Sequence, residues 1–394
     1  MAESAAVAGY AVCSLDAFGD LDQHPAVRAV SLPRDVGVPF TVDAVVRAAE
    51  RIETDVVAYL SPFENHPVAV ERLARGRTLW GNGASVLRRV RRPGVVSRPA
   101  GVSSPDRWLV KPRASGGGHG IEWWSPGNPV PAGSHVEPFI DGEPGSIVFV
   151  AAGRAIVPLG LTRQLVGDAA FGATGFRYCG SILHVIPSVA RDRLGVIPSA
   201  ARDRDPPDRG LSQLFDSALH VARGVVTEFD LVGVNCIDFI ARDGIAMPIE
   251  INPRWSASME LVERAHGVSV FGVHAAACAA SELPTFDLTR GDTDTAVTGK
   301  AIVFARHDVI CGDTAAWLGD TTVRDVPHPG EHIPAGRPVC TVFASSRDAD
   351  SCHTALIARA NRLYETLESW PACRHDATLR HRERHLSWLR LCLR

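Results

Sequence analysis

Lysine is almost absent from this sequence. Of its 41 basic side chains only two are lysine, Lys111 and Lys300, and the other 39 are arginine. Such a bias can reflect genome composition, in which case the two lysines remain by chance. It also makes each remaining lysine a candidate for a position where the chemistry requires an ammonium group.

Long hydrophobic runs are missing as well. No apolar stretch approaches the roughly 18 residues of a membrane-spanning helix, and the start shows no arginine-led, apolar-cored segment of the kind that directs secretion. The net charge is −3, which gives no bulk electrostatic reason to bind nucleic acid or an anionic membrane surface. We therefore expect a cytoplasmic protein that binds neither nucleic acid nor membrane.

Cysteines spaced for a metal site or a disulfide framework are also absent. The nine cysteines are scattered, odd in number, and include no C-x-x-C pair. This pattern indicates reduced thiols that mostly fill the core. The 394 residues are 45% hydrophobic and 22% charged, which is typical of a globular protein with two or three domains.

Residues 1–92 predict a small α/β domain. The pattern indicates helices at 2–9 and 41–51 and strands at 10–15 and 55–60, an order that favours a parallel sheet. Because an α/β unit normally opens with a strand, we hypothesise that the first strand is missing or that the start codon is misplaced. A stretch rich in Arg, Pro and Gly, 88–105, is interpreted as a linker or exposed segment.

The remaining chain is richer in strands. IPSVARDR at 186–193 recurs as IPSAARDR at 197–204, and we interpret this duplication as part of an inserted surface loop. The predicted parts are a core domain at 93–284 with the inserted loop at 187–210, a C-terminal domain at 285–370 and a basic tail at 371–394. The predicted elements are helices at 211–229, 258–266, 270–281 and 355–367 and strands at 232–241, 245–251, 297–305 and 339–344.

The first candidate site is WLVKPRASGGGHGI at 108–121. An apolar strand leads to Lys111, and the loop after it consists of Ser115, Gly116, Gly117, Gly118, His119 and Gly120. Glycines let backbone N–H groups turn toward an anion, and a lysine on the preceding strand can reach the same phosphates. The residue order excludes a P-loop, and no helix follows as a dinucleotide fingerprint requires. By itself, the segment fits a plain glycine-rich hairpin about as well as a phosphate-binding loop.

The second candidate site is VNCIDFIARDGIAMPIEINPR at 234–254, two predicted strands joined by a tight turn. Side chains alternate along a strand, so Glu250 and Asn252 share a face. For Asp238 to share that face, the turn must hold an odd number of residues. We therefore expect a three-residue turn at 242–244, with its glycine in the left-handed conformation. Asp238, Glu250 and Asn252 would then supply hard oxygen ligands that suit Mg²⁺.

Arg254 follows directly after this predicted metal site. An arginine two residues beyond Asn252 can pair with a phosphoryl oxygen as charge builds up during phosphoryl transfer. The alternative is a charged hairpin edge without a ligand, and the order acid–x–Asn–Pro–Arg after an apolar strand argues against it.

A third segment, HVEPFIDGEPGSIVFV at 135–150, lies between these two sites. It contains Glu137, the apolar pair Phe139 and Ile140, and an acidic turn through Glu143. A purine could lie against it, with Glu137 accepting from the adenine amino group, the backbone of Ile140 pairing with the ring and Glu143 holding the ribose. Acidic turns are common, so the chemistry alone is weak support.

In this order, the three segments resemble the ATP-grasp superfamily over roughly residues 108–254. FGDLD at 18–22, WGNG at 80–83 and the stretch at 324–344 look like its predicted carboligase branch, which is similar in outline to biotin carboxylase and to the carboxylate–amine ligases of one-carbon carrier cofactor biosynthesis. The resemblance implies a fold of the α/β and α+β classes, with an N-terminal α/β domain, a two-subdomain ATP-binding core and a small C-terminal domain.

The resemblance also implies roles for matching residues. Lys111 would contact the α- and β-phosphates of ATP, and two Mg²⁺ ions, or Mn²⁺ in their place, would bind the acidic hairpin. The adenine would lie at the 137–140 segment. Many ATP-grasp enzymes carry a second phosphate-binding lysine before the core. Here that region offers only Arg88, Arg89, Arg91 and Arg92, and a guanidinium is bulkier and places its charge differently.

The predicted reaction is ATP-dependent joining of a small-molecule carboxylate to an amine through an acyl phosphate. Lys111, Arg254 and the metal ions would supply positioning and charge, so no nucleophilic Cys or Ser is required. Arg163 and Arg177 are candidates to hold the substrate carboxylate or the acyl phosphate, or they form surface ion pairs. By resemblance, an amino acid and an amine-bearing cofactor precursor are the first substrates to consider.

Two other functions stay open at this point. A bicarbonate-using carboxylase would share the ATP site, and so would an ATP-binding regulatory module without turnover. The sequence is compatible with a homodimer.

Overall fold

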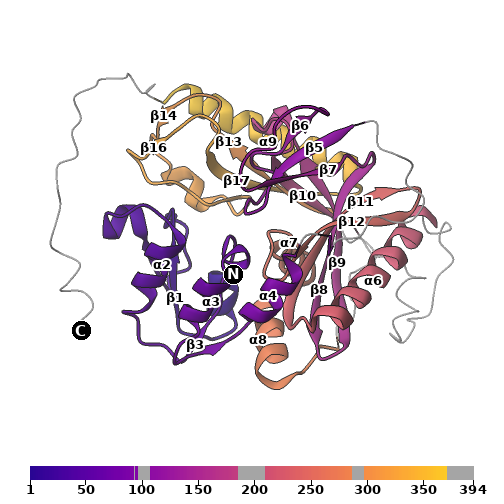
Figure 1. The fold of residues 1–394 in the computed structure, drawn as a ribbon. Helices are drawn as coiled ribbons and strands as arrows, with labels where there is room; N and C mark the ends of the chain where they lie inside the picture. The colour runs from indigo at the N-terminus through magenta and orange to yellow at the C-terminus, as the bar shows by residue number, and fades with distance from the viewer. Residues whose placement is uncertain (93, 96–106, 185–208, 286–296, 371–394) are drawn as a thin grey trace, which may run out of the picture.

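The computed structural model describes residues 1–92, 94–95, 107–184, 209–285 and 297–370. The predicted repeat, nearly all of the predicted loop at 187–210 and the predicted tail at 371–394 lie outside these residues. Within the described part, no helix is both long and apolar enough to cross a membrane. The described residues combine α/β and α+β architecture, as the sequence predicts (Figure 1).

The N-terminal segment contains two small parallel sheets rather than one. Strand β1 pairs with β2, and β3 pairs with β4. The sequence did not indicate β2, a five-residue strand between polar segments, and the strand expected at 55–60 forms only over Val56–Val57. The elements are α1 (Ala2–Val7), β1 (Val12–Asp16), β2 (Val27–Ser31), η1 (Leu32–Val36), α2 (Val42–Ala49), β3 (Val56–Val57), η2 (Phe63–Asn65), α3 (Pro67–Leu73), β4 (Thr78–Leu79) and α4 (Ala84–Val90).

A separate three-stranded antiparallel sheet carries the first candidate site. Its strands are β5 (Trp108–Pro112), β6 (Glu122–Trp124) and β7 (Ser134–Pro138). Strand β5 lies in the middle and pairs with both neighbours. The glycine loop is therefore the connection of the β5–β6 hairpin, which confirms that a strand and no helix follows it.

An eight-stranded sheet forms the centre of the molecule, in the order β12-β11-β8-β9-β10-β13-β17-β15. Helix α6 covers one face, and α7 and α8 pack on the other through the apolar side chains that the strands present in alternation. Its strands and flanking helices up to residue 280 are β8 (Glu143–Ala152), β9 (Ala155–Val166), η3 (Ala169–Phe171), β10 (Tyr178–His184), α6 (Arg209–Phe229), β11 (Gly233–Arg242), β12 (Ile245–Asn252), α7 (Met259–His266) and α8 (Val270–Ala280).

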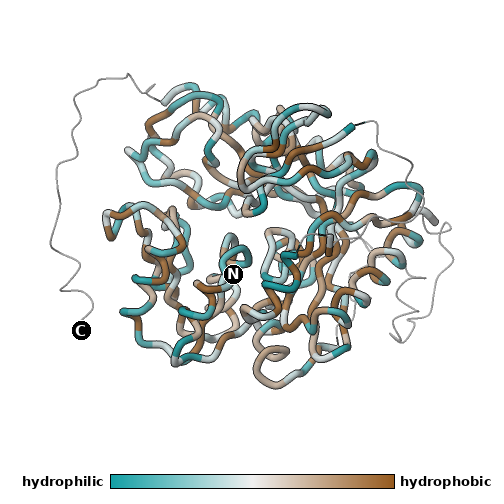
Figure 2. The backbone as a smooth tube through the Cα atoms, in the orientation of Figure 1, coloured by the Kyte–Doolittle hydropathy of each residue, from teal (hydrophilic) through white to brown (hydrophobic). Residues whose placement is uncertain are grey.

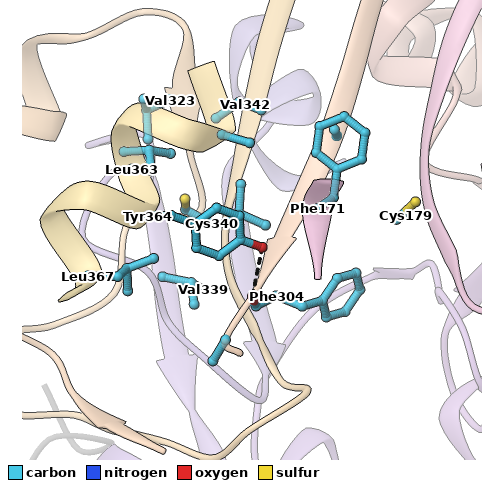
Figure 3. Packing of buried hydrophobic residues seen from close by; sticks show 14 of the residues in the cluster. Phe171, Cys179, Phe304, Val323, Val339, Cys340, Val342, Leu363, Tyr364 and Leu367 are labelled. Atoms are coloured by element: carbon cyan, nitrogen blue, oxygen red, sulfur yellow. Dashed lines mark hydrogen bonds between the residues drawn. The ribbon is translucent and has the colours of Figure 1, made fainter. Parts of the chain in front are cut away.

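The C-terminal segment extends this same sheet. Strand β13, which lies beyond the predicted boundary at 284, pairs with β10, and β17 pairs with β13. The remaining elements are β13 (Val297–Phe304), β14 (Val309–Ile310), η5 (Ala315–Gly319), β15 (Val323–Arg324), β16 (His332–Ile333), β17 (Pro338–Ser346) and α9 (Ala349–Glu368). Helix α9 packs on this end of the sheet, where the buried hydroxyl of Tyr364 donates to the carbonyl oxygen of Phe304 at 3.0 Å (Figure 3).

Hydropathy along the backbone agrees with this layering. The long strands of the central sheet carry hydrophobic stretches, and α6 alternates between hydrophobic and hydrophilic residues along its length (Figure 2). Its apolar residues, such as Phe215, Ala222 and Val226, are fully or almost fully buried against the sheet. The helical periodicity of this segment therefore predicted both the helix and its buried face.

The hairpin of the second candidate site differs from the expected one. Arg242 pairs directly with Ile245, so the turn has two residues, Asp243 and Gly244, and both have positive φ as a type I′ turn requires. The expected three-residue turn is therefore wrong. Asp238 nevertheless pairs directly with Glu250, because a β-bulge between residues 238 and 239 leaves one extra residue on β12. The one extra residue that was expected in the turn therefore lies in the bulge on β12.

Two glycine substitutions should have opposite effects on stability. Gly224 lies on the exposed side of α6 with open space around its Cα, so Gly224→Ala should raise the free energy of unfolding by about 0.5–1 kcal/mol. A Cβ at Gly180 would clash with the backbone of Lys300 on β13, so Gly180→Ala should lower it by about 1–3 kcal/mol. Urea unfolding followed by circular dichroism measures both, and equal effects would contradict the described packing.

Candidate functional site

A cavity of about 910 Å³ lies between the three-stranded sheet, the β11–β12 hairpin and the end of α4. It brings the three candidate segments together although they are far apart in the sequence. The predicted site residues that line it are Lys111, Ser115, Gly116, Gly117, Gly118, Glu137, Phe139, Ile140, Asp238, Glu250, Asn252 and Arg254.

Five other candidates are not among the lining residues: His119, Gly120, Glu143, Arg163 and Arg177. Glu143 is exposed at the start of β8. Arg163 pairs with the exposed Asp350, with its Nη1 3.1 Å from Oδ1. Arg177 donates to the carbonyl oxygen of Gly336, and its guanidinium carbon lies 5.0 Å from the ring centroid of Phe304. Both arginines thus have partners within the protein.

The glycine loop is packed closely against residues 176–178. The backbone N–H of Tyr178 donates to the carbonyl oxygen of Gly117 at 3.0 Å. Gly118 has a φ of +73°, and a Cβ on it would clash with the carbonyl oxygen of Phe176. This position therefore requires glycine both for its backbone conformation and for its close approach to the neighbouring chain.

Lys111 is held by the third candidate segment. Its Nζ forms an ion pair with Oε1 of Glu137, and the Nε2 of His135 lies 3.3 Å from the other carboxylate oxygen. Strand β7 lies beside β5, with Lys111 directly opposite His135. The lysine predicted for the phosphates and the carboxylate predicted for the adenine thus share one end of the cavity.

Asp238, Glu250 and Asn252 converge as the sequence predicts. The Nδ2 of Asn252 donates to Oδ2 of Asp238 at 2.9 Å, and the Nε2 of Gln164 donates to Oδ1 at 2.8 Å. Burial and the nearby charge of Glu250 raise the pKa of Asp238 to about 7.

This donor set fits a divalent cation such as Mg²⁺. Two carboxylates and an amide oxygen are hard ligands, and a cation between them would relieve the repulsion between Asp238 and Glu250. The described residues contain no group of three His, Cys, Asp or Glu side chains placed to hold a metal ion. The fit therefore depends on the amide of Asn252 as the third donor.

The two arginines nearest to this acidic group are held by a carboxylate from the N-terminal segment. Glu64, in η2, is 1% exposed and accepts from Nε and Nη2 of Arg254 at 2.8 and 2.7 Å. Arg91, just after α4, donates from Nη1 to Oε1 of Glu250 at 3.1 Å, and its Nη2 lies 3.7 Å from Oε1 of Glu64.

Of the four arginines in the segment 88–92, only Arg91 and Arg92 line the cavity. Arg88 pairs with Glu71 at 2.8 Å, and Arg89 pairs with Asp230 at 3.2 Å. The structure thus separates the two arginines that line the cavity from the two that form ion pairs elsewhere, a distinction that the sequence does not show.

Sequence reasoning missed Glu64 and Gln164 and gave Asn82 no role beyond the WGNG motif. Asn82 is 1% exposed, and its Nδ2 donates to Oδ1 of Asn235 at 2.8 Å and to the carbonyl oxygen of Pro253 at 2.9 Å. It therefore joins the N-terminal segment to β11 and to the residue that follows β12. Its place in a motif was a signal, whereas Glu64 and Gln164 stand in segments without any pattern that marks them.

Lys300, the second lysine, lies outside the lining of the cavity. Its Nζ donates to Oε2 of Glu260 on α7 at 2.9 Å, and its side chain is 8% exposed. Burial acts to lower the pKa of Lys300, but the Glu260 carboxylate outweighs it and raises the pKa. This lysine therefore connects β13 to α7 as a buried ion pair.

The chain contains an ATP-grasp domain and has the ATP-grasp fold. A family model described as an ATP-grasp domain matches residues 87–194, which include the glycine loop and the 135–150 segment. A search of curated protein sequences finds no match.

Solved structures of the same fold include carboxylases and a ligase. A complex of biotin carboxylase from Campylobacter jejuni with β-γ-ATP aligns with a TM-score of 0.58 at 11% identity, over 89% of this chain and 85% of that one. An L-amino acid ligase from Bacillus licheniformis has a TM-score of 0.58 at 14% identity, over 92% and 93%. The biotin carboxylase domain of 2-oxoglutarate carboxylase from Hydrogenobacter thermophilus, in complex with MgADP, ADP and bicarbonate, has a TM-score of 0.58 at 12% identity, over 93% and 86%.

Gly118→Ala should weaken binding of MgADP by about tenfold or more, because the added Cβ moves the loop away from residues 176–178. The matched control is Gly133→Ala, since Gly133 has a similar φ of +77° but nothing within 4 Å of the added Cβ. Its affinity should stay within about twofold of the wild type. Isothermal titration calorimetry measures both, and equal losses would show that the contact with Phe176 has no part in binding.

Proposed function

We propose that this protein is an ATP-dependent ligase that joins a small-molecule carboxylate to an amine through an acyl phosphate. The observation that carries the proposal is that Lys111 with the glycine loop and the Asp238–Glu250–Asn252 group with Arg254 line one cavity. A lysine beside a glycine loop suits phosphates, and the acidic group suits the metal ions that accompany them.

The proposed reaction has two steps. A carboxylate oxygen of the first substrate attacks the γ-phosphorus of ATP, and the bond to the β–γ bridging oxygen breaks to release ADP. The amine of the second substrate then attacks the acyl carbon, phosphate leaves, and the nitrogen loses a proton. Both steps need positioning and charge neutralisation more than covalent help from the protein.

The lining residues would divide these tasks between them. Asp238, Glu250 and Asn252 would hold two Mg²⁺ ions, which supply positive charge at the transferred phosphoryl group when bound. Lys111 would contact the α- and β-phosphates, and Arg254 the oxygens of the transferred group. The adenine would lie against Phe139 and Ile140, beside Glu137.

We base the proposal on the residues that line the cavity and leave Glu143, Arg163 and Arg177 out of it. For the second phosphate-binding cation, we propose Arg91 or Arg92, because both line the cavity. Similarity in fold to an L-amino acid ligase supports an amino acid as one substrate.

A bicarbonate-using carboxylase is the second candidate, because carboxylases share the fold over most of this chain. Such an enzyme would use the same ATP site. It would differ from the proposed ligase in its substrates, with bicarbonate as the group that is phosphorylated and a different acceptor. A phosphate-release assay separates the two reactions.

A phosphate-release screen should identify an amino acid that stimulates ATP hydrolysis in the presence of an amine. The screen supplies MgATP with single amino acids and with pairs, in the presence and absence of bicarbonate. Stimulation by bicarbonate alone would favour the carboxylase. Binding of MgADP without stimulation by any acceptor would instead indicate an ATP-binding module without turnover.

Glu250→Gln should lower kcat in the screen by about a hundredfold or more, because the proposed metal site loses one of its two carboxylates. The matched control is Glu122→Gln, an exposed glutamate on β6 that should leave kcat unchanged. Full ATP-dependent turnover of the Glu250 variant would disprove the metal assignment.

A further inference from the structure

The carboxylate of Glu64 is the least exposed charged group at the candidate site, and it comes from outside the ATP-grasp match. It lies in the short helix η2 of the N-terminal segment and is 1% exposed. The family model covers residues 87–194, and the resemblance assigns no role to Glu64.

Glu64 connects two arginines that face the proposed metal ligands. Its Oε1 accepts two hydrogen bonds from Arg254, and Nη2 of Arg91 lies 3.7 Å from the same oxygen. Arg91 in turn donates to Glu250. The four side chains form an alternating series of charges, Arg254–Glu64–Arg91–Glu250, that begins and ends at the acidic hairpin and passes through the N-terminal segment.

Several polar atoms of this series are buried and lack a hydrogen-bond partner among the described residues. They are Oε2 of Glu64 and Nε and Nη2 of Arg91. A buried polar atom without a hydrogen-bond partner lowers the stability of the fold. These atoms therefore still have the capacity to accept or donate hydrogen bonds. Arg91 in particular has donors left over in the cavity.

The negative charge of Glu64 offsets the positive charges of Arg254 and Arg91. Burial acts to raise the pKa of Glu64, but the Arg254 guanidinium outweighs it and lowers the pKa, so the carboxylate is charged at neutral pH. Without that charge, Arg254 and Arg91 would still lie close to the carboxylates of Asp238 and Glu250. Nη2 of Arg254 already lies 3.1 Å from Oδ1 of Asn252, whose Nδ2 donates to Asp238. Arg254 therefore already contacts one of the proposed metal ligands and lies close to the two carboxylates.

We propose that Glu64 is a positioning residue that holds Arg254 away from the carboxylates of Asp238 and Glu250 and limits the competition of Arg91 for Glu250, and so leaves those carboxylates available to the divalent cation. The inference rests on the proposed binding of nucleotide and Mg²⁺. It assigns the N-terminal segment a direct part in the metal affinity of the site.

The test is the Mg²⁺ dependence of ADP binding in Glu64→Gln. The substitution keeps the shape of the side chain and removes its charge. The Mg²⁺ concentration for half-maximal enhancement of ADP binding, measured by calorimetry, should rise about tenfold, because the arginines now compete for the carboxylates. ADP affinity in the presence of a chelator should not fall, since Glu64 itself does not line the cavity. An unchanged Mg²⁺ dependence would overturn the proposal.

The matched control is Glu71→Gln. Glu71 lies in the same segment, is half exposed and pairs with Arg88 outside the cavity. This variant makes the same change of charge and should keep the wild-type Mg²⁺ dependence. An equal shift in both variants would mean that net charge, and not the contact with Arg254 and Arg91, sets the metal affinity.

A second variant keeps the test decisive if Glu64→Gln does not fold. Arg91→Gln removes a partly exposed competitor from Glu250 and leaves Glu64 in place, so half-maximal enhancement should require less Mg²⁺ than in the wild type. An unchanged or higher requirement would contradict the competition. Failure of the wild type to bind MgADP at all would instead refute the proposed function.

Discussion

The direct pairing of Asp238 with Glu250 across β11 and β12 is the contact on which the candidate site depends. Side chains alternate along each strand, so a two-residue turn with regular pairing would place these two carboxylates on opposite faces of the sheet. The single extra residue of the bulge restores the alignment. As a result, Glu250 lies close enough to Asp238 to add to the effect of burial, and both raise the pKa of Asp238. Arg91 and Arg254 lie beside this pair, where Arg91 donates to Glu250 and Arg254 donates to Asn252.

The N-terminal segment completes the site although its own sheets are small. Asn82 ties it to the start of β11 and to the residue after β12, and Glu64 holds Arg254. The segment also meets the C-terminal end of the large sheet, where the carboxylate of Asp22 accepts from the backbone of Val326. Two of the short motifs that carried the resemblance, at 18–22 and 80–83, are thus places where distant parts of the chain meet.

The elements with strong periodicity were predictable. Helix α6 and strands β11 and β12 appear within two residues of the expected bounds, because each buries one face against the sheet and the pattern reports that burial directly. Parallel pairing in the N-terminal segment was also expected, but the two strands that were predicted there, β1 and β3, lie in different sheets. Strand β2 was missed because a five-residue strand at the edge of a two-stranded sheet leaves little periodic signal. The length of the turn was predicted wrongly because the alternation of side chains requires one extra residue but does not tell whether that residue lies in the turn or in a bulge.

The two lysines show how much the sequence alone can predict about the site. The sequence by itself determined the order of the chemistry-bearing segments and hence the ATP-grasp resemblance, because the glycine loop, the acidic strand and the arginine after it are local patterns. It made both lysines conspicuous, and it predicted a role in phosphate binding for Lys111 alone, because Lys111 precedes the glycine loop. Only the tertiary structure decided that Lys111 lines the cavity while Lys300 is paired with Glu260, and that Glu64 reaches Arg254. These outcomes depend on contacts between residues far apart in the chain, and such contacts exist only once the sheets are packed together.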